Sequence, residues 1–140
     1  MSRVPFHARA ALLSILLLAG CSGERPVTGL VDGRLRPCPD TPNCVCSDAA
    51  DEAHAIAPLQ ADLQTIFELL AGMERVTIVT HTDTYLYAEF TSRVFRFVDD
   101  VEFHADGRGT VHVRSASRLG YSDMGVNRKR IETIRAALTR

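Results

Sequence analysis

The stretch FVDDVEFHADGRGTVHVRSAS, residues 97–117, decides the fold of this chain. Apolar and polar side chains alternate on both sides of Asp106-Gly107, a dipeptide that favours a tight hairpin turn. The pattern predicts an antiparallel hairpin whose strands run over residues 94–104 and 110–117.

Charge pairing indicates a register for this hairpin. A register that places Asp100 opposite Arg114 joins opposite charges across the strands, which stabilises a sheet by about 0.2–1 kcal/mol per pair. The same register places Asp99, Ser115 and Ser117 on the face of the sheet that carries the phenylalanines. Apolar packing is expected on that face, so its polar side chains need internal partners.

Apolar spacing predicts one helix before the strands and one after the hairpin. Apolar side chains recur every three or four residues over residues 59–70, and Gly72 ends this pattern. The second helix is expected over residues 123–138, with Ser122 or Asp123 as its N-terminal cap.

Two further strands are predicted between the first helix and the hairpin. Residues 76–80 are all β-branched. Over residues 84–91, Leu86, Ala88 and Phe90 alternate with tyrosine and glutamate side chains, which places the two sets on opposite faces of a strand. The order of helix, four strands and helix predicts a single α+β domain over residues 37–140, with an antiparallel sheet and both helices on one face. Residues 21–36 are rich in glycine, proline and charge, and we expect them to form a flexible tether.

The N-terminus has the layout of a secretory signal peptide. Arg3 and Arg9 precede a short apolar run that ends at Leu18, and Ala19-Gly20 provides a small-residue cleavage site. The run is shorter than the roughly 20 apolar residues that span a bilayer. Residues 1–20 are therefore expected to be removed on export.

Cys21 follows this cleavage site directly, and LLAGC at residues 17–21 resembles the lipobox of bacterial lipoproteins. The resemblance implies a diacylglyceryl group on Cys21, an acylated N-terminus and an anchor in the bacterial envelope facing the periplasm. Ser22 stands where inner-membrane lipoproteins carry Asp, which favours the outer membrane. The alternative is an ordinary signal peptide that a cysteine follows by coincidence.

The remaining cysteines favour one disulfide. An exported chain meets an oxidising compartment. Cys38 and Cys44 close a loop that two prolines stiffen, whereas a bond between Cys44 and Cys46 would be strained. We expect the Cys38–Cys44 disulfide and a free Cys46. A metal site of the three thiols and His54 is the alternative, but it lacks the usual Cys-x2-Cys spacing, so neither a metal nor another cofactor is predicted.

Charge is unevenly distributed along the chain. The chain carries a net charge of −1, whereas residues 107–140 contain eight basic and two acidic residues. The overall balance argues against a nucleic-acid partner, which favours a strongly basic face. The basic C-terminal part either pairs with acidic residues inside the fold or forms a local site for an anion.

Charged and hydroxyl side chains gather at the end of the hairpin and the start of the last helix. One interpretation is a structural staple, in which Asp99 holds the following loop or the last helix against the sheet. The other is a pocket for an anionic group, since guanidinium groups suit phosphate and carboxylate. The side chains of this predicted site are Asp99, Asp100, Arg114, Ser115, Ser117, Arg118, Asn127 and Arg128.

Four motifs follow one another in the chain: CP and PNCV within residues 38–45, FVDDVEF at 97–103, RSASRLGYSD at 114–123 and GVNRKR at 125–130. Their order resembles the family called domain of unknown function 1499 (DUF1499), over about residues 37–138. The resemblance implies a shared domain and supplies no reaction. Family members usually carry Ser where this chain has Cys46, a departure that argues against a shared three-thiol metal site.

The sequence favours a binding role over catalysis. It shows no Ser-His-Asp spacing, no phosphate-binding glycine loop and no metal-binding helix motif. We therefore expect a non-catalytic module, anchored to the membrane through Cys21, that binds an anionic or amphipathic small molecule or an unidentified protein. The alternative is a small envelope hydrolase or transferase that uses Asp99, Ser115 and Arg114; no catalytic residue is assigned from the sequence.

Overall fold

The computed structural model describes residues 22–140; the expected signal peptide and Cys21 lie outside the described residues. The described elements are β1 (Leu30–Val31), β2 (Arg34–Leu35), β3 (Cys44–Cys46), β4 (Leu59–Gln60), α1 (Leu63–Ala71), β5 (Val76–His81), β6 (Tyr85–Thr91), β7 (Val98–Ala105), β8 (Thr110–Ser117) and α2 (Val126–Leu138). This composition confirms the α+β class.

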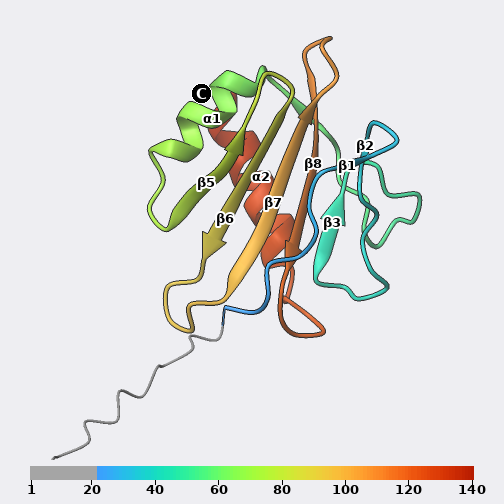
Figure 1. Ribbon diagram of the computed structural model, residues 1–140, viewed down its shortest axis with the longest axis vertical. Helices are drawn as coiled ribbons and strands as arrows, with labels where there is room; N and C mark the ends of the chain where they lie inside the picture. Colours follow the sequence, from blue (N-terminus) through green and yellow to red (C-terminus); the bar gives the residue numbers. More distant parts are fainter. Residues whose placement is uncertain (1–21) are drawn as a thin grey trace, which may run out of the picture.

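An antiparallel sheet with the strand order β3-β8-β7-β6-β5 forms the centre of the fold (Figure 1). Strand β4 also pairs with β8, and β1 and β2 form a separate two-stranded sheet. The described part thus has six strands in one sheet and two in another, more than the four predicted. Strands β3 and β4 are only 3 and 2 residues long, which is too short to produce a periodic signal.

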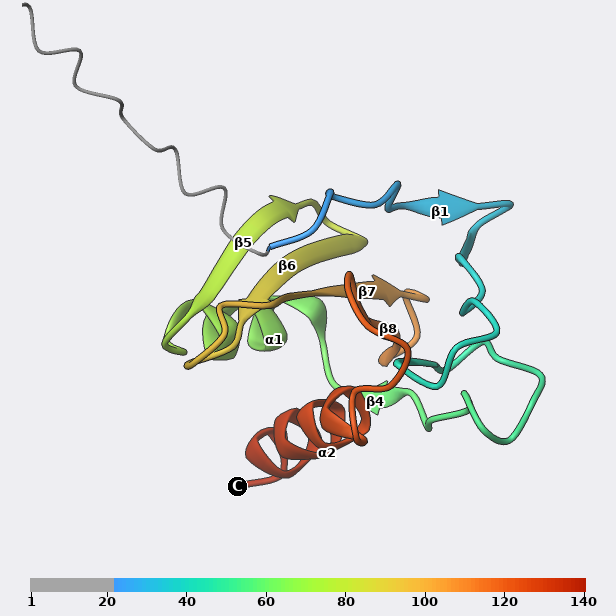
Figure 2. The ribbon, with the colours of Figure 1, turned by 90° about the horizontal axis from the view of Figure 1, so that it is seen from below.

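Both helices pack on the same face of the sheet, as predicted, and we call this the helix face (Figure 2). The core lies between them and the strands, and its largest fully buried side chains include Phe103, Leu70 and Ile131. Burial of such side chains contributes about 1.5–3 kcal/mol each. Among the described residues, neither helix has the length and apolar character needed to cross a bilayer.

Helix α1 begins later than the sequence predicts. Its cap is Asp62, whose side chain accepts a hydrogen bond from the Thr65 amide at 2.8 Å. Leu59 instead belongs to β4, where it pairs with Val111. The prediction was wrong here because the apolar spacing continues from the strand into the helix. Gly72 follows the last helical residue, as predicted.

Strand β7 also begins later than predicted, at Val98. Residues 92–97 form a loop that is closed by hydrogen bonds between Ser92 and Phe97. Arg96 in this loop has a φ of 58°, a left-handed conformation that a strand does not contain. Residues 94–97 are all exposed. The predicted strand therefore began too early, because the alternation of side chains continues into this loop.

The hairpin of β7 and β8 differs from the predicted register by two residues. Asp100 lies opposite Ala116, and Arg114 lies opposite Glu102. The Asp106 carboxylate accepts hydrogen bonds from the amides of Arg108 and Thr110, which fixes the shorter loop over residues 107–109. A shift of two residues leaves each side chain on its predicted face.

Residues 22–36 lie along the face of the sheet opposite the helices, which we call the N-terminal face (Figure 2). Arg25 forms an ion pair with Glu89 at 2.7 Å, and the Gly29 amide donates to Glu102 at 2.7 Å. Leu35 is buried. The expected flexible tether does not fit these residues, because carboxylates of the sheet bind their charged and amide groups.

Candidate functional site

The eight side chains of the predicted site do not meet in one pocket. On the helix face, the hydrogen-bonded residues are Asp99, Ser115, Ser117 and Asn127. On the N-terminal face they are Asp100, Arg114 and Arg118. Arg128 binds elsewhere, to the carbonyls of Ala53 and Ala55. Most residues of the predicted site therefore belong to two separate networks on opposite faces of the sheet.

The network on the helix face joins helix α2 to strand β8. Asn127 accepts from the Ser115 hydroxyl at 2.5 Å and donates to the Ser117 hydroxyl at 2.9 Å and the Asn43 carbonyl at 3.0 Å. Arg130 adds an ion pair with Asp99 and a hydrogen bond to Ser115 at 3.0 Å. This arrangement matches the predicted staple.

Arg130 is absent from the predicted site, although it belongs to the same network. It follows Asn127 by three residues, so both side chains point from one face of α2. Its guanidinium carbon also lies 4.9 Å from the centre of the Phe90 ring. The helical spacing of Asn127 and Arg130 was the signal that could have revealed it.

Asp123 stabilises the start of α2, although the residue that caps the helix is Gly125. Its carboxylate accepts from the amides of Gly125 at 2.9 Å and Asn127 at 2.7 Å. Burial raises the pKa of Asp123, but the hydrogen bonds from Asn127 and Gly125 outweigh this effect and hold the pKa below its usual range. Asp123 thus binds amides at the start of the helix, as expected of a capping side chain, but it lies two residues before the cap position.

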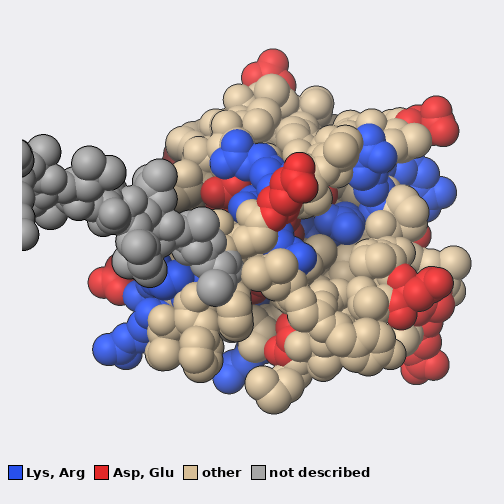
Figure 3. Space-filling model, turned by 60° about the horizontal axis from the view of Figure 1, so that its bottom comes forward, with Lys and Arg blue, Asp and Glu red and all other residues tan. Residues whose placement is uncertain are grey.

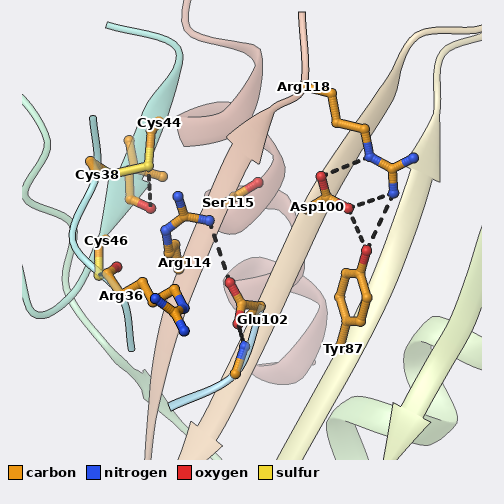
Figure 4. Close-up of polar contacts among 12 residues, drawn as sticks. Arg36, Cys38, Cys44, Cys46, Tyr87, Asp100, Glu102, Arg114, Ser115 and Arg118 are labelled. Carbon is orange, nitrogen blue, oxygen red and sulfur yellow. Dashed lines mark hydrogen bonds and ion pairs between the residues drawn. A yellow bond between two sulfur atoms is a disulfide. The ribbon is translucent and has the colours of Figure 1, made fainter. Parts of the chain in front are cut away.

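Arg118 is the centre of the network on the N-terminal face (Figure 4). Its guanidinium donates twice to Asp100, at 2.9 and 2.7 Å, and once to Glu89 at 2.6 Å. Tyr87 donates its hydroxyl to Asp100 at 2.5 Å. Arg25 binds Glu89 from the N-terminal segment, so this network also holds that segment on the sheet.

These contacts shift the pKa values of the side chains in the network. The hydrogen bond to Asp100 raises the pKa of Arg118. Burial raises the pKa of Glu89, but hydrogen bonds from Arg118 and Arg25 outweigh this effect and lower the pKa overall. Burial and the contact with Asp100 raise the pKa of Tyr87. The network is therefore a set of compensated charges at neutral pH.

Glu102 is the centre of a second group on the same face. Its carboxylate is fully buried and accepts from the Gly29 amide, the Tyr85 hydroxyl and Arg114, at 2.7, 2.7 and 3.3 Å. Burial, together with the bond to Glu102, raises the pKa of Tyr85, which remains a neutral donor.

Arg36 and Arg114, the second of which binds Glu102, each retain an unused donor. The Nε atom of each is buried and has no hydrogen-bond partner. Both residues adjoin Cys46, which lies opposite Arg114 in the sheet and whose Sγ is 4.0 Å from the Arg36 carbonyl (Figure 4). Sequence reasoning missed Arg36 because it ends the segment that was expected to be a tether.

The cysteines adopt the predicted pairing. Cys38 and Cys44 form a disulfide with their Cα atoms 5.7 Å apart, and Cys46 is free and buried. Burial raises the pKa of the Cys46 thiol. His54 contacts Asp51 and the Thr41 carbonyl through its two ring nitrogens. A metal site that needs all three thiolates is incompatible with this disulfide.

Comparison with known proteins identifies the family. Residues 34–138 match the sequence model of the family described as Protein of unknown function (DUF1499). The chain belongs to the DUF1499 family. No curated protein and no solved structure matched it.

The contacts within this DUF1499 domain do not favour the hydrolase alternative. A serine nucleophile needs a neighbouring base. The partners of the Ser115 hydroxyl are instead Asn127 and Arg130. His104 and His112 line a separate depression of about 320 Å³, where His112 faces Asp48 at 2.8 Å. The described contacts of Ser115 therefore provide no base for a serine nucleophile.

Proposed function

We propose that the protein is a non-catalytic, lipid-anchored protein of the bacterial envelope that binds an anionic group at Arg36 and Arg114. The resemblance of residues 17–21 to a lipobox supports the anchor at Cys21. The two buried, unpartnered Nε atoms support the binding site. The proposal keeps the anionic ligand expected from the sequence. The contacts of that ligand are now Arg36 and Arg114 and no longer the whole predicted set of eight residues.

Energetics favour an acceptor at this position. A buried donor without a partner costs roughly 1–3 kcal/mol, so a ligand that accepts from both Nε atoms would recover part of that cost. Glu102 already accepts three hydrogen bonds, and none of them comes from either Nε atom. Phosphate or carboxylate oxygens match the geometry of guanidinium donors.

The Arg118 network is less suited to binding an anionic ligand. Its guanidinium already binds Asp100, Glu89 and Tyr87. An anion at Arg118 would have to replace two carboxylates of the protein. We therefore place the ligand at Arg36 and Arg114, and assign Arg118 and Asn127 to holding the fold together.

Titration with inorganic phosphate and with a small carboxylate tests the binding site. We expect binding by the unaltered protein and a loss of at least tenfold in affinity in Arg36→Gln. Arg34→Gln is the matched control, because the Arg34 side chain is largely exposed and 3.9 Å from Asp48. Equal affinities in the unaltered protein and both variants would contradict this site, as would the absence of binding by the unaltered protein.

Membrane fractionation tests the anchor separately. We expect Cys21→Ser to move the protein from the membrane fraction to the soluble periplasmic fraction, and intact mass measurement to detect acyl chains only on the unaltered protein. Unchanged partitioning together with an unchanged mass would contradict lipidation. The anion titration does not depend on this result.

A further inference from the structure

We infer that the domain rests on the lipid bilayer with one particular end, and that two loops of this end enter the membrane surface. The loops are residues 92–97, between β6 and β7, and residues 118–125, between β8 and α2. We call them together the apolar end. The inference rests on the proposed lipid anchor and adds an orientation to it.

Large apolar side chains are exposed on both loops. Phe95 is 69% exposed and Met124 is 94% exposed. The other exposed apolar side chains of these loops are Val94, Phe97, Leu119 and Tyr121. Figure 1 shows both loops at the same end of the sheet. Clustered exposed apolar side chains mark surfaces that contact another apolar phase.

The N-terminus of the described chain is packed at this same end. Gly23 lies so close to the loop after β8 that a Cβ added to it would be 3.0 Å from the Arg118 Cβ and 3.1 Å from the Leu119 Cγ. Figures 1 and 2 show the start of the described chain beside the loops. Cys21 is separated from Gly23 by Ser22 alone, so acyl chains on Cys21 would begin next to the apolar end.

Charge at this end suits an anionic bilayer. Arg93 and Arg96 are exposed within the first loop. A basic residue near an anionic membrane contributes about 1 kcal/mol of attraction. Asp123 of the second loop is turned toward the amides of α2, where it is already bound. Figure 3 brings this end forward and shows both basic and acidic side chains among mainly uncharged ones.

A single tryptophan can report which end meets the lipid. The chain contains no tryptophan, so Phe95→Trp introduces a unique fluorophore at the apolar end. Val31→Trp is the control, because Val31 is 43% exposed on β1, away from both loops (Figure 1). Each full-length chain is purified from membranes, its acylation is checked by intact mass, and it is reconstituted into vesicles of phosphatidylethanolamine and phosphatidylglycerol.

We expect the emission of Phe95→Trp to move to shorter wavelength in vesicles, and lipids with brominated acyl chains to quench it several times more strongly than that of Val31→Trp. Equal quenching of the two variants in acylated protein would overturn the inference while leaving the anchor intact. Shielding of Phe95→Trp in native envelopes but not in protein-free vesicles would also overturn it, since a protein would then cover this end. If Cys21 carries no acyl chains, the proposed anchor fails, and quenching in added vesicles still decides whether the loops enter lipid.

Discussion

Arg118 and Asp100 are joined by two hydrogen bonds beneath the N-terminal segment, from Nε to Oδ2 at 2.9 Å and from Nη2 to Oδ1 at 2.7 Å. Their side chains are 6% and 1% exposed. The pair is therefore shielded from solvent, and it links the loop after β8 to the middle of the sheet.

Removing this guanidinium is expected to destabilise the fold strongly. Arg118→Ala leaves the carboxylates of Asp100 and Glu89 without their shared partner, which should cost about 3–5 kcal/mol in the free energy of unfolding. Urea denaturation measures the loss. Arg108→Ala is the control, because the largely exposed Arg108 side chain should contribute less than about 0.5 kcal/mol. Equal unfolding midpoints for the two variants would show that Arg118 does not hold the sheet together.

Asn127 should be a structural residue of similar importance. Asn127→Ala removes partners from Ser115, Ser117 and the Asn43 carbonyl, so we expect a loss of about 2–3 kcal/mol. Thermal unfolding gives the measurement, with the exposed Lys129→Ala as a control on the same helix. A melting temperature close to that of the control would argue against the staple.

Acid should weaken the contacts of Glu89 with Arg25 and Arg118. The pKa of Glu89 lies below its usual range, so the unfolded chain binds a proton at higher pH than the folded chain does. The contribution of Glu89 to stability is therefore complete above an unfolded pKa of about 4.3 and is lost as pH falls through the lower folded value. Urea unfolding between about pH 7 and 3 should show a shallower acid dependence in Glu89→Gln than in the unaltered protein. Parallel curves would contradict this assignment.

Reduction of the disulfide should lower stability by a moderate amount. Cys38 and Cys44 lie 6 positions apart in the sequence, and closure of such a loop contributes about 2 kcal/mol in the chain-entropy description. We expect calorimetry to show a lower melting temperature after treatment with a reductant. The double variant Cys38→Ser, Cys44→Ser should melt at that lower temperature with or without the reductant. A further decrease on reducing this variant would point to an effect unrelated to the disulfide.

Long periodic segments allowed much of the fold to be predicted. Strands β6 and β8 and helix α2 have clear patterns, and their apolar side chains face the core as expected. The errors arose where one pattern passed into another element. Leu59 continued the helical spacing from β4, and Phe95 continued the strand alternation into a loop.

The candidate site was harder to predict because it depends on partners that are distant in the sequence. Asp99 and Asp100 are adjacent in the chain, yet they contact Arg130 on one face of the sheet and Arg118 on the other. The alternation of a strand predicts that separation, but the sequence does not show which arginine reaches each carboxylate. Arg36 was missed because nothing in its local pattern indicated that its segment would pack on the sheet.

The enclosed position of Cys46 has a consequence for the covalent integrity of the chain. Thiol–disulfide exchange requires a thiolate that can reach a disulfide sulfur. Cys46 is 0% exposed, and its raised pKa keeps the sulfur protonated. The folded domain therefore preserves the Cys38–Cys44 crosslink against scrambling, and two copies of the folded chain cannot be crosslinked through Cys46.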